Sequence, residues 1–223
     1  MILGRVGIVV SARTASSRLP GKALIPLGGR PMVLFLLDRL RVARGGQVVL
    51  ATTTLPSDDL LAKVVLDAGV PVFRGSPEDL VQRYCDLAEE FGFDTLVRVT
   101  ADCPFVDAEL VEYCLNQMAA LEGCDLVTTK GIFPIGLDAE LFSFGLLQSL
   151  NVNSQLSVQD REHLTLYLYN NAYRVARLQL PAAWSTSNLV FTVDTPADYR
   201  RAQHLVSRMG CCDFSVQDLL ELK

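Results

Sequence analysis

The sequence contains only two histidines and one tryptophan among its 223 residues, and its six cysteines never form a CxxC pair. Zinc sites built from closely spaced cysteines or from clustered histidines are therefore not expected. A disulfide framework is typical of smaller, loop-rich secreted chains. We expect reduced thiols, several of them in the core.

Long apolar runs and an excess of positive charge are also missing. The longest apolar runs, such as residues 32–37 and 48–51, are too short to cross a membrane, and the N-terminal run has no cleavage-site pattern. The formal net charge is -5, which argues against the broad basic face that nucleic-acid binding requires. We therefore expect a cytoplasmic protein whose partners include neither a membrane nor a nucleic acid.

Short β-type runs alternate with amphipathic helical windows over the first 130 residues. The alternation predicts a three-layer α/β/α fold with a mostly parallel sheet covered by helices on both sides. Ligands of such a fold bind outside the carboxyl ends of the strands. The expected strands are residues 5–10, 48–52, 70–74, 95–100 and 125–129, and the expected helices are residues 31–44, 57–68, 78–91 and 107–120.

Several helix boundaries are marked by capping chemistry. Ser57 and Asp107 stand where an N-cap side chain would accept the first free amides of a helix. Thr195, Pro196 and Asp198 have the spacing of a capping box with proline at the first helical position. These signals predict helices that begin at the three places.

The pattern becomes less regular after residue 130. A helix is expected to open near Asp160, and residues 174–180 and 188–193 are strand-like. No linker separates this half from the first, and the length suits one domain. We therefore expect a single domain over residues 1–223.

The segment "VSARTASSRLPGK" follows the apolar run of residues 6–10 and gathers Arg13, Arg18 and Lys22 in one short loop. Backbone amides and cations at the mouth of a parallel sheet suit the phosphates of a nucleotide. The loop has neither the Walker A pattern nor GxGxxG. A phosphate-binding loop and a solvated basic turn both fit the segment taken alone.

Two aspartates supply charge of the opposite sign. Asp102 in "VRVTADCP" and Asp194 in "FTVDTP" each follow a strand-like run, so strands of one sheet would bring them to the edge that carries the basic loop. Carboxylates facing a phosphate site suit Mg²⁺, which prefers hard oxygen ligands. Each aspartate taken alone also fits an ordinary turn or cap. The three features together favour a metal-assisted nucleotide site.

Seven blocks of sequence, taken in order, resemble the SpsF-type polysaccharide-biosynthesis cytidylyltransferases, relatives of CMP-Kdo and CMP-sialate synthetases. The blocks are "ARTASSRLPGK", "ATTTLPSDD", "GVPVFRGSPEDLVQRY", "VRVTADCPFVD", "GLDAELFS", "REHLTLYL" and "FTVDTPADY". The resemblance implies a nucleotide-diphospho-sugar transferase-like fold and Mg²⁺-dependent transfer of CMP from CTP to a sugar or sugar acid. It also implies a nucleotide-binding part over about residues 1–130, a sugar-binding part over about 131–223, and a homodimer.

The resemblance further implies roles for individual residues. Arg13, Arg18 and Lys22 would hold the phosphates beside the backbone of Ser11 and Ala12, and Asp102 and Asp194 would hold the metal. The base and ribose would lie at the ends of the second and third strands, and the sugar in the second half. The base and ribose residues are Thr52, Thr53, Arg74, Gly75 and Ser76, and the sugar-binding residues are Gly136, Asp138, Glu140, Glu162 and His163.

The chain also departs from the family pattern. The family usually has Met-Gly at Thr14-Ala15 and Arg-Trp at Val190-Phe191, and Ala197 replaces an acidic residue. Two other hypotheses therefore stay open. One is a glycosyltransferase or another nucleotidyltransferase on the same fold, and the other is a catalytically weak nucleotide-binding protein.

A few conspicuous residues are expected to be structural. The acidic pair Asp58-Asp59 is expected on a capped or solvated helix face. Trp184 is expected to pack in the core, and His204 has the place of a structural helix residue. His163, in "REH", fits a helix cap or surface contact as well as a sugar contact.

Overall fold

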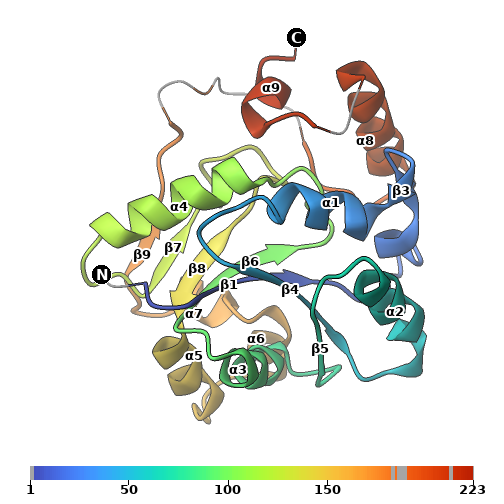
Figure 1. Ribbon diagram of the computed structural model, residues 1–223. Coiled ribbons are helices and arrows are strands. Elements are labelled where there is room, and N and C mark those ends of the chain that lie inside the picture. The colour runs from blue at the N-terminus through green and yellow to red at the C-terminus, as the bar shows by residue number, and fades with distance from the viewer. Residues whose placement is uncertain (1–2, 182–183, 185–189, 211–212, 223) are drawn as a thin grey trace.

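A sheet of short strands forms the centre of the molecule (Figure 1). The strands are rich in buried β-branched residues. The computed structural model describes residues 3–181, 184, 190–210 and 213–222. Seven strands form the sheet in the order β5-β4-β1-β6-β8-β7-β9, and β2-β3 is a separate hairpin. Their bounds are β1 Val6–Ser11, β2 Pro26–Leu27, β3 Arg30–Pro31, β4 Gln47–Thr53, β5 Val72–Gly75, β6 Thr95–Thr100, β7 Leu126–Thr128, β8 Glu140–Ser143 and β9 Val175–Arg177.

Four neighbouring strands of the sheet, β5, β4, β1 and β6, run parallel, as the alternation predicts. β1 pairs in parallel with β4 and β6, and β4 pairs in parallel with β5. β8 is the exception, because it runs antiparallel to both β6 and β7. The carboxyl ends of β1, β4, β5 and β6 therefore meet at one edge.

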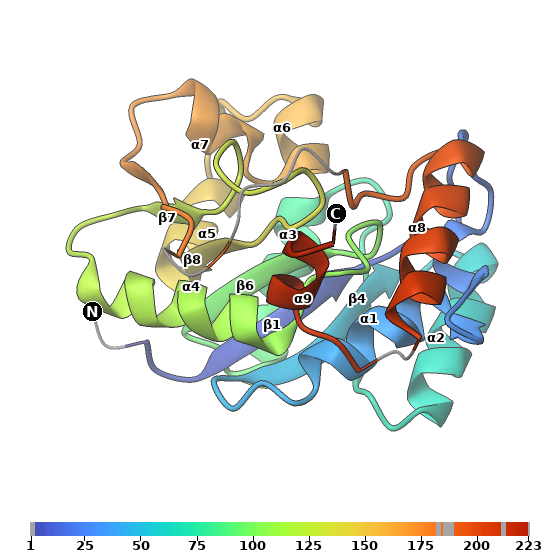
Figure 2. The same ribbon diagram turned by 90° about the horizontal axis from the view of Figure 1, so that it is seen from above.

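Helices cover both faces of the sheet, which confirms the expected three-layer fold (Figure 1). α1 and α4 pack on one face, and α3 and α5 pack on the other. Seen from above, α4, α9 and α8 lie across the first face in that order (Figure 2). The helices are α1 Met32–Leu40, α2 Asp59–Asp67, α3 Leu80–Phe91, α4 Ala108–Ala120, α5 Phe144–Asn151, α6 Val158–His163, α7 Leu166–Asn170, α8 Pro196–Met209 and α9 Val216–Leu220.

The side chains of β1 alternate between two apolar cores. Ile8 and Val10 are buried in the core beneath α1 and α4, and Val9 is buried in the core beneath α3. This alternation follows from the two-residue period of a strand. A strand buried on both faces is rigid, so the loop after Ser11 starts from a well-defined point.

The capping predictions were right at two places and wrong at one. The Asp107 side chain accepts the Leu110 amide at the start of α4, and Thr195 and Asp198 form a capping box at the start of α8. Ser57 caps nothing. It lies in a 3₁₀ turn, η2 (Pro56–Asp58), and α2 follows with no side-chain cap.

The strand-like run of residues 188–193 was also predicted wrongly in its described part. Residues 190–193 form no strand, and residues 188–189 lie outside the described ranges. The Phe191 amide donates to the Ile135 carbonyl at 2.7 Å, and the Val193 amide donates to the Asp102 carbonyl at 2.8 Å. The Arg201 side chain donates to the carbonyls of Val190 and Thr192, so the segment is held by separate hydrogen bonds to loops and to α8 and not by a ladder.

Trp184 packs as expected. It is 7% exposed, and its ring centroid lies 5.9 Å from that of Phe133 and 6.2 Å from that of Tyr113. His204, in contrast, lies on the exposed side of α8. In the part of the chain that the structure describes, no helix is both long and apolar enough to cross a membrane.

The cysteines that can be assessed are thiols. Cys85, Cys103 and Cys114 are free and buried, and Cys124 is free and partly exposed. Cys211 and Cys212 lie outside the described residues. The expectation of reduced thiols is thus confirmed for the four described cysteines.

Candidate active site

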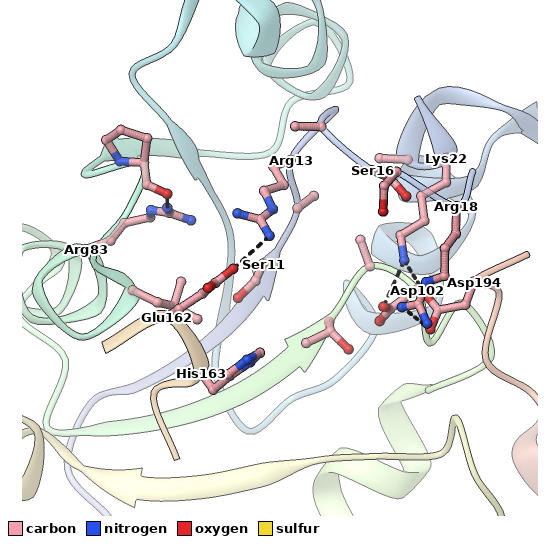
Figure 3. Close-up of a pocket in the computed structure, with 18 of the residues that line it drawn as sticks. Ser11, Arg13, Ser16, Arg18, Lys22, Arg83, Asp102, Glu162, His163 and Asp194 are labelled. Carbon is pink, nitrogen blue, oxygen red and sulfur yellow. Dashed lines mark hydrogen bonds and ion pairs between the residues drawn. The ribbon is translucent and has the colours of Figure 1, made fainter. Parts of the chain in front are cut away.

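A cavity of about 370 Å³ opens at the carboxyl ends of β1 and β6 (Figure 3). This is the edge where a parallel sheet is expected to bind its ligand. The loop after β1, the loop after β6, α6 and the segment before α8 all contribute to it. The sequence-predicted residues among its lining are Ser11, Ala12, Arg13, Arg18, Lys22, Asp102, Glu162, His163 and Asp194.

Lys22 joins the two aspartates at one end of this cavity. Its Nζ lies 2.9 Å from Asp102 Oδ2 and 2.7 Å from Asp194 Oδ1. Arg18 Nη2 lies 3.0 Å from Asp194 Oδ2. Figure 3 shows the side chains of Lys22, Asp102 and Asp194 pointing toward one another from separate segments. The expected convergence of Asp102 and Asp194 at the basic loop is therefore confirmed.

The electrostatics keep Lys22 and Asp102 ionised. Burial alone would lower the pKa of Lys22, but the two carboxylates raise it above its ordinary value. Burial alone would raise the pKa of Asp102, but Lys22 and a hydrogen bond from Thr100 hold it below its ordinary value. Opposite charges at this distance favour the charged form of each group. Lys22 is therefore a cation and Asp102 an anion throughout the neutral range.

A glycine allows the Asp194 segment to approach this edge although it is not a strand. Gly136 has a φ of +94°, which side-chain-bearing residues rarely adopt. A Cβ at this position would lie 2.2 Å from the Thr192 amide nitrogen. The missing side chain at Gly136 thus lets residues 191–193 cross close to the loop that precedes β8.

Asp58 is buried and binds the basic loop, so its expected place on a capped or solvated helix face was wrong. It is 1% exposed, and Oδ1 accepts the Thr14 amide at 2.8 Å and the Thr14 hydroxyl at 2.6 Å. The Thr53 hydroxyl donates to Oδ2. Burial opposes ionisation, but these hydrogen bonds lower the pKa of Asp58 below its ordinary value. The carboxylate therefore ties the loop to the end of β4.

Glu162 and His163 lie across the cavity from the basic loop. Arg13 Nη2 is 3.2 Å from Glu162 Oε1, and the two side chains are about half exposed. The pair is solvated and therefore weak. Both side chains can exchange this contact for another partner at low cost.

The residues predicted to contact base and ribose lie at the ends of β4 and β5. None of them is among the described residues that line the larger cavity. Arg74 donates from Nε to the Thr53 carbonyl and from Nη2 to the Leu55 carbonyl, both at 2.9 Å, and Nη2 also pairs with Asp59. Their role stays a prediction. The residues are Thr52, Thr53, Arg74, Gly75 and Ser76.

A second, smaller cavity of about 190 Å³ adjoins the first. Both cavities are lined by Arg98, Thr100 and Asp102. Asp138 and Glu140, two of the predicted sugar-binding residues, line only the smaller one. Because the cavities share a wall, ligands in the two would meet there.

Sequence reasoning missed the two arginines that complete these cavities. Arg83 donates from Nε to the Ser76 carbonyl at 2.7 Å and lines the larger cavity. Arg98 lies within β6, where its charge interrupts an otherwise apolar strand. That interruption is the signal that could have identified Arg98. Arg83 gives no such signal, because arginine is ordinary on an amphipathic helix.

The two aspartates are suited to a divalent cation only if a ligand completes the coordination. Within the described ranges, no cluster of three or more histidine, cysteine or acidic side chains could hold a metal by itself. Mg²⁺ is commonly bound by one or two carboxylates, with waters and substrate phosphates as the other ligands. Asp102 and Asp194 fit that donor set.

A mostly parallel sheet with a basic loop and two aspartates at its carboxyl edge is typical of the nucleotidyltransferase-like fold. The structure of the CTP complex of CMP:2-keto-3-deoxy-manno-octonic acid synthetase has this fold, with a TM-score of 0.73 at 18% identity over 92% of this chain and 100% of that chain. A cytidylyltransferase from Leptospira borgpetersenii is more similar. Its TM-score is 0.90 at 32% identity, over 98% of this chain and 93% of that chain.

Sequence comparison makes the assignment specific. Residues 7–212 match the family model described as "Cytidylyltransferase". The chain is 32% identical over 222 residues to SpsF, a spore coat polysaccharide biosynthesis protein of Bacillus subtilis, with coverage of 96% of this chain and 92% of that protein. The chain belongs to the cytidylyltransferase family, and it is a nucleotidyltransferase that transfers a cytidylyl group.

The close crossing at Gly136 gives a first prediction. We expect Gly136→Ala to move the Asp194 segment and to lower the rate of pyrophosphate release at least tenfold, because the new Cβ meets the Thr192 backbone. Gly69→Ala is the matched control. Gly69 also has a positive φ, of +77°, but no heavy atom lies within 4 Å of the added Cβ. Equal rates in the two variants would contradict the role of Gly136.

Proposed function

We propose that this protein transfers CMP from CTP to a sugar or sugar acid and releases pyrophosphate, as a step in the synthesis of a surface polysaccharide. The observation that carries the proposal is the cluster of Lys22, Asp102 and Asp194 at the carboxyl edge of the sheet. The names of two similar proteins agree with it. SpsF acts in polysaccharide biosynthesis, and the 2-keto-3-deoxy-manno-octonic acid synthetase forms a CMP sugar.

CTP would occupy the larger cavity with its triphosphate on the basic loop. Arg18 and Lys22 supply charge for the outer phosphates, and Arg13 can leave the solvated Glu162 for a phosphate oxygen. The backbone at Ser11 and Ala12 would flank the nucleotide. The base and ribose would extend toward the ends of β4 and β5, with the predicted residues Thr52, Thr53, Arg74, Gly75 and Ser76.

Mg²⁺ is the proposed cofactor. Asp102 and Asp194 would hold it, and when bound it would neutralise phosphate charge. Lys22, now shared by the two carboxylates, would then be available to pyrophosphate as it leaves. Positioning and charge neutralisation supply most of the rate in phosphoryl transfer, so little covalent chemistry is required of the protein.

The acceptor would enter through the smaller cavity. Asp138 accepts the Gly136 amide at 3.3 Å, and burial raises the pKa of its carboxyl group. Asp138 is suited to bind an acceptor hydroxyl, and Glu162 and His163, which line the larger cavity, would contact the acceptor from that side. In the reaction the acceptor oxygen forms a bond to the α-phosphorus, the bond from that phosphorus to the pyrophosphate oxygen breaks, and the hydroxyl proton passes to water.

An acceptor screen tests the proposal. CTP, Mg²⁺ and a panel of sugars and sugar acids would be incubated with the protein, and pyrophosphate release would be measured. We expect release with CTP that depends on one acceptor class. In a parallel incubation with a sugar nucleotide in place of CTP, sugar transfer without pyrophosphate release would support a glycosyltransferase instead. CTP binding by calorimetry without turnover of any acceptor would support a catalytically weak binding protein.

Lys22 provides a second prediction. Lys22→Ala is expected to weaken CTP binding at least tenfold and CMP binding much less, because the ammonium would contact the outer phosphates that CMP lacks. Calorimetric titrations of both nucleotides with Mg²⁺ measure the two affinities. Equal weakening of CTP and CMP would place Lys22 elsewhere.

Asp102 provides a third prediction. Asp102→Asn is expected to lower the turnover number by two or more orders of magnitude, because a neutral amide binds Mg²⁺ poorly. Circular dichroism and thermal unfolding check that the variant folds. Asp67→Asn, on the exposed side of α2, is the matched control. Near-normal turnover in folded Asp102→Asn would remove this residue from the metal site.

A further inference from the structure

Arg98 forms part of the wall that the two cavities share. It lines both the larger cavity and the smaller one, and its side chain is only 11% exposed. If CTP fills the larger cavity and the acceptor fills the smaller, the transferred phosphoryl group must cross this wall. The other two shared residues are Thr100, at the end of β6, and Asp102.

Glu140 holds the Arg98 guanidinium in place. The two residues are directly opposed across the antiparallel pair β6-β8, and Arg98 Nη1 pairs with Glu140 Oε2. Glu140 is 1% exposed, and its Oε1 accepts the hydroxyls of Thr165 and Tyr169, each at 2.8 Å. Lys130 Nζ lies 3.2 Å from the same oxygen. The Glu140 carboxylate therefore has four side-chain partners: one arginine, one lysine and two hydroxyls.

These contacts keep the pair charged. Burial opposes ionisation of Glu140, but Arg98, followed by Lys130 and the hydroxyls, lowers its pKa to about 2. The guanidinium is nevertheless incompletely bonded. Among the described residues no polar group bonds to the buried Arg98 Nε. A buried cation with donor capacity left over is suited to a negatively charged ligand.

We propose that Arg98 is a catalytic residue that donates to the α-phosphoryl oxygens as CMP passes from pyrophosphate to the acceptor. Glu140 is its positioning residue. The inference rests on the function proposed above. As the acceptor oxygen bonds to phosphorus and pyrophosphate leaves, charge redistributes over the phosphoryl oxygens, where an oriented cation shielded from water is most effective.

A purely structural ion pair makes a different prediction from a catalytic arginine. Removing one member of a buried pair leaves an uncompensated charge, whereas removing both together is often tolerated. The double variant Arg98→Gln/Glu140→Gln would therefore recover both stability and activity if the pair were only structural. If Arg98 acts on the phosphoryl group, the double variant would recover stability alone.

The experiment measures kcat, KM for CTP and the thermal midpoint for the wild type, both single variants and the double variant. We expect kcat to fall about 100-fold or more in Arg98→Gln and in the double variant, with KM for CTP changed less than about tenfold. Arg98→Lys should restore part of kcat. Arg5→Gln, before the amino end of β1, is the control and should match the wild type.

The outcomes separate the two proposals. Recovery of kcat to within about threefold of wild type in the double variant would overturn the assignment of Arg98 and leave the cytidylyltransfer reaction intact. A rise in KM alone, with kcat unchanged, would also overturn it. Absence of pyrophosphate release by the wild type with every acceptor would overturn the acceptor chemistry proposed above, and the role of Arg98 with it.

Discussion

One ammonium group joins three segments that are far apart in the chain. Lys22 Nζ binds Asp102, just past the end of β6, and Asp194, just before α8. Its side chain is 16% exposed, so its charge and those of the carboxylates are only partly screened by water. The larger cavity exists because these segments are held at one edge of the sheet. Two of the three have a further determinant: Asp58 binds the backbone of the basic loop, and the missing side chain at Gly136 leaves room for the Asp194 segment.

The parallel part of the fold could be predicted from the sequence because its signals are local. β6 occupies residues 95–100 as expected, and Asp107 caps α4 as its position suggests. The antiparallel β8 could not be predicted in the same way. It has four residues, the first three of them buried, and so short a run carries no information on strand direction. The segment before α8 resembles a strand in composition, but its backbone amides at Phe191 and Val193 bond to loop carbonyls and not to a neighbouring strand.

The candidate site, too, could be predicted from the sequence only where its signals are local. The cations of the basic loop and the two aspartates were predictable, because charge at the end of an apolar run is visible in the sequence. Asp58 was not, since an acidic pair at a helix start usually faces solvent, and only the tertiary structure turns this carboxylate toward Thr14. Two of the hydrogen bonds that Asp58 accepts come from Thr14, a position at which the chain departs from the family pattern. This residue supplies both an amide and a hydroxyl to Asp58, so the loop here is anchored by a side chain.

The ion pairs also constrain how a triphosphate can enter the cavity. Arg18 and Lys22 are already bound to carboxylates, so phosphates that claim these cations leave Asp102 and Asp194 unpaired beside new negative charge. Like charges in a partly buried site strongly oppose such an arrangement. Asp102 and Asp194 would avoid this conflict if they held a divalent cation that accompanied the triphosphate, since Arg18 and Lys22 could then pair with the phosphates. In the proposed function, nucleotide and metal therefore bind cooperatively. The metal would replace the cations that the phosphates take from the two carboxylates, and the phosphates would replace the carboxylates that the metal takes from Arg18 and Lys22.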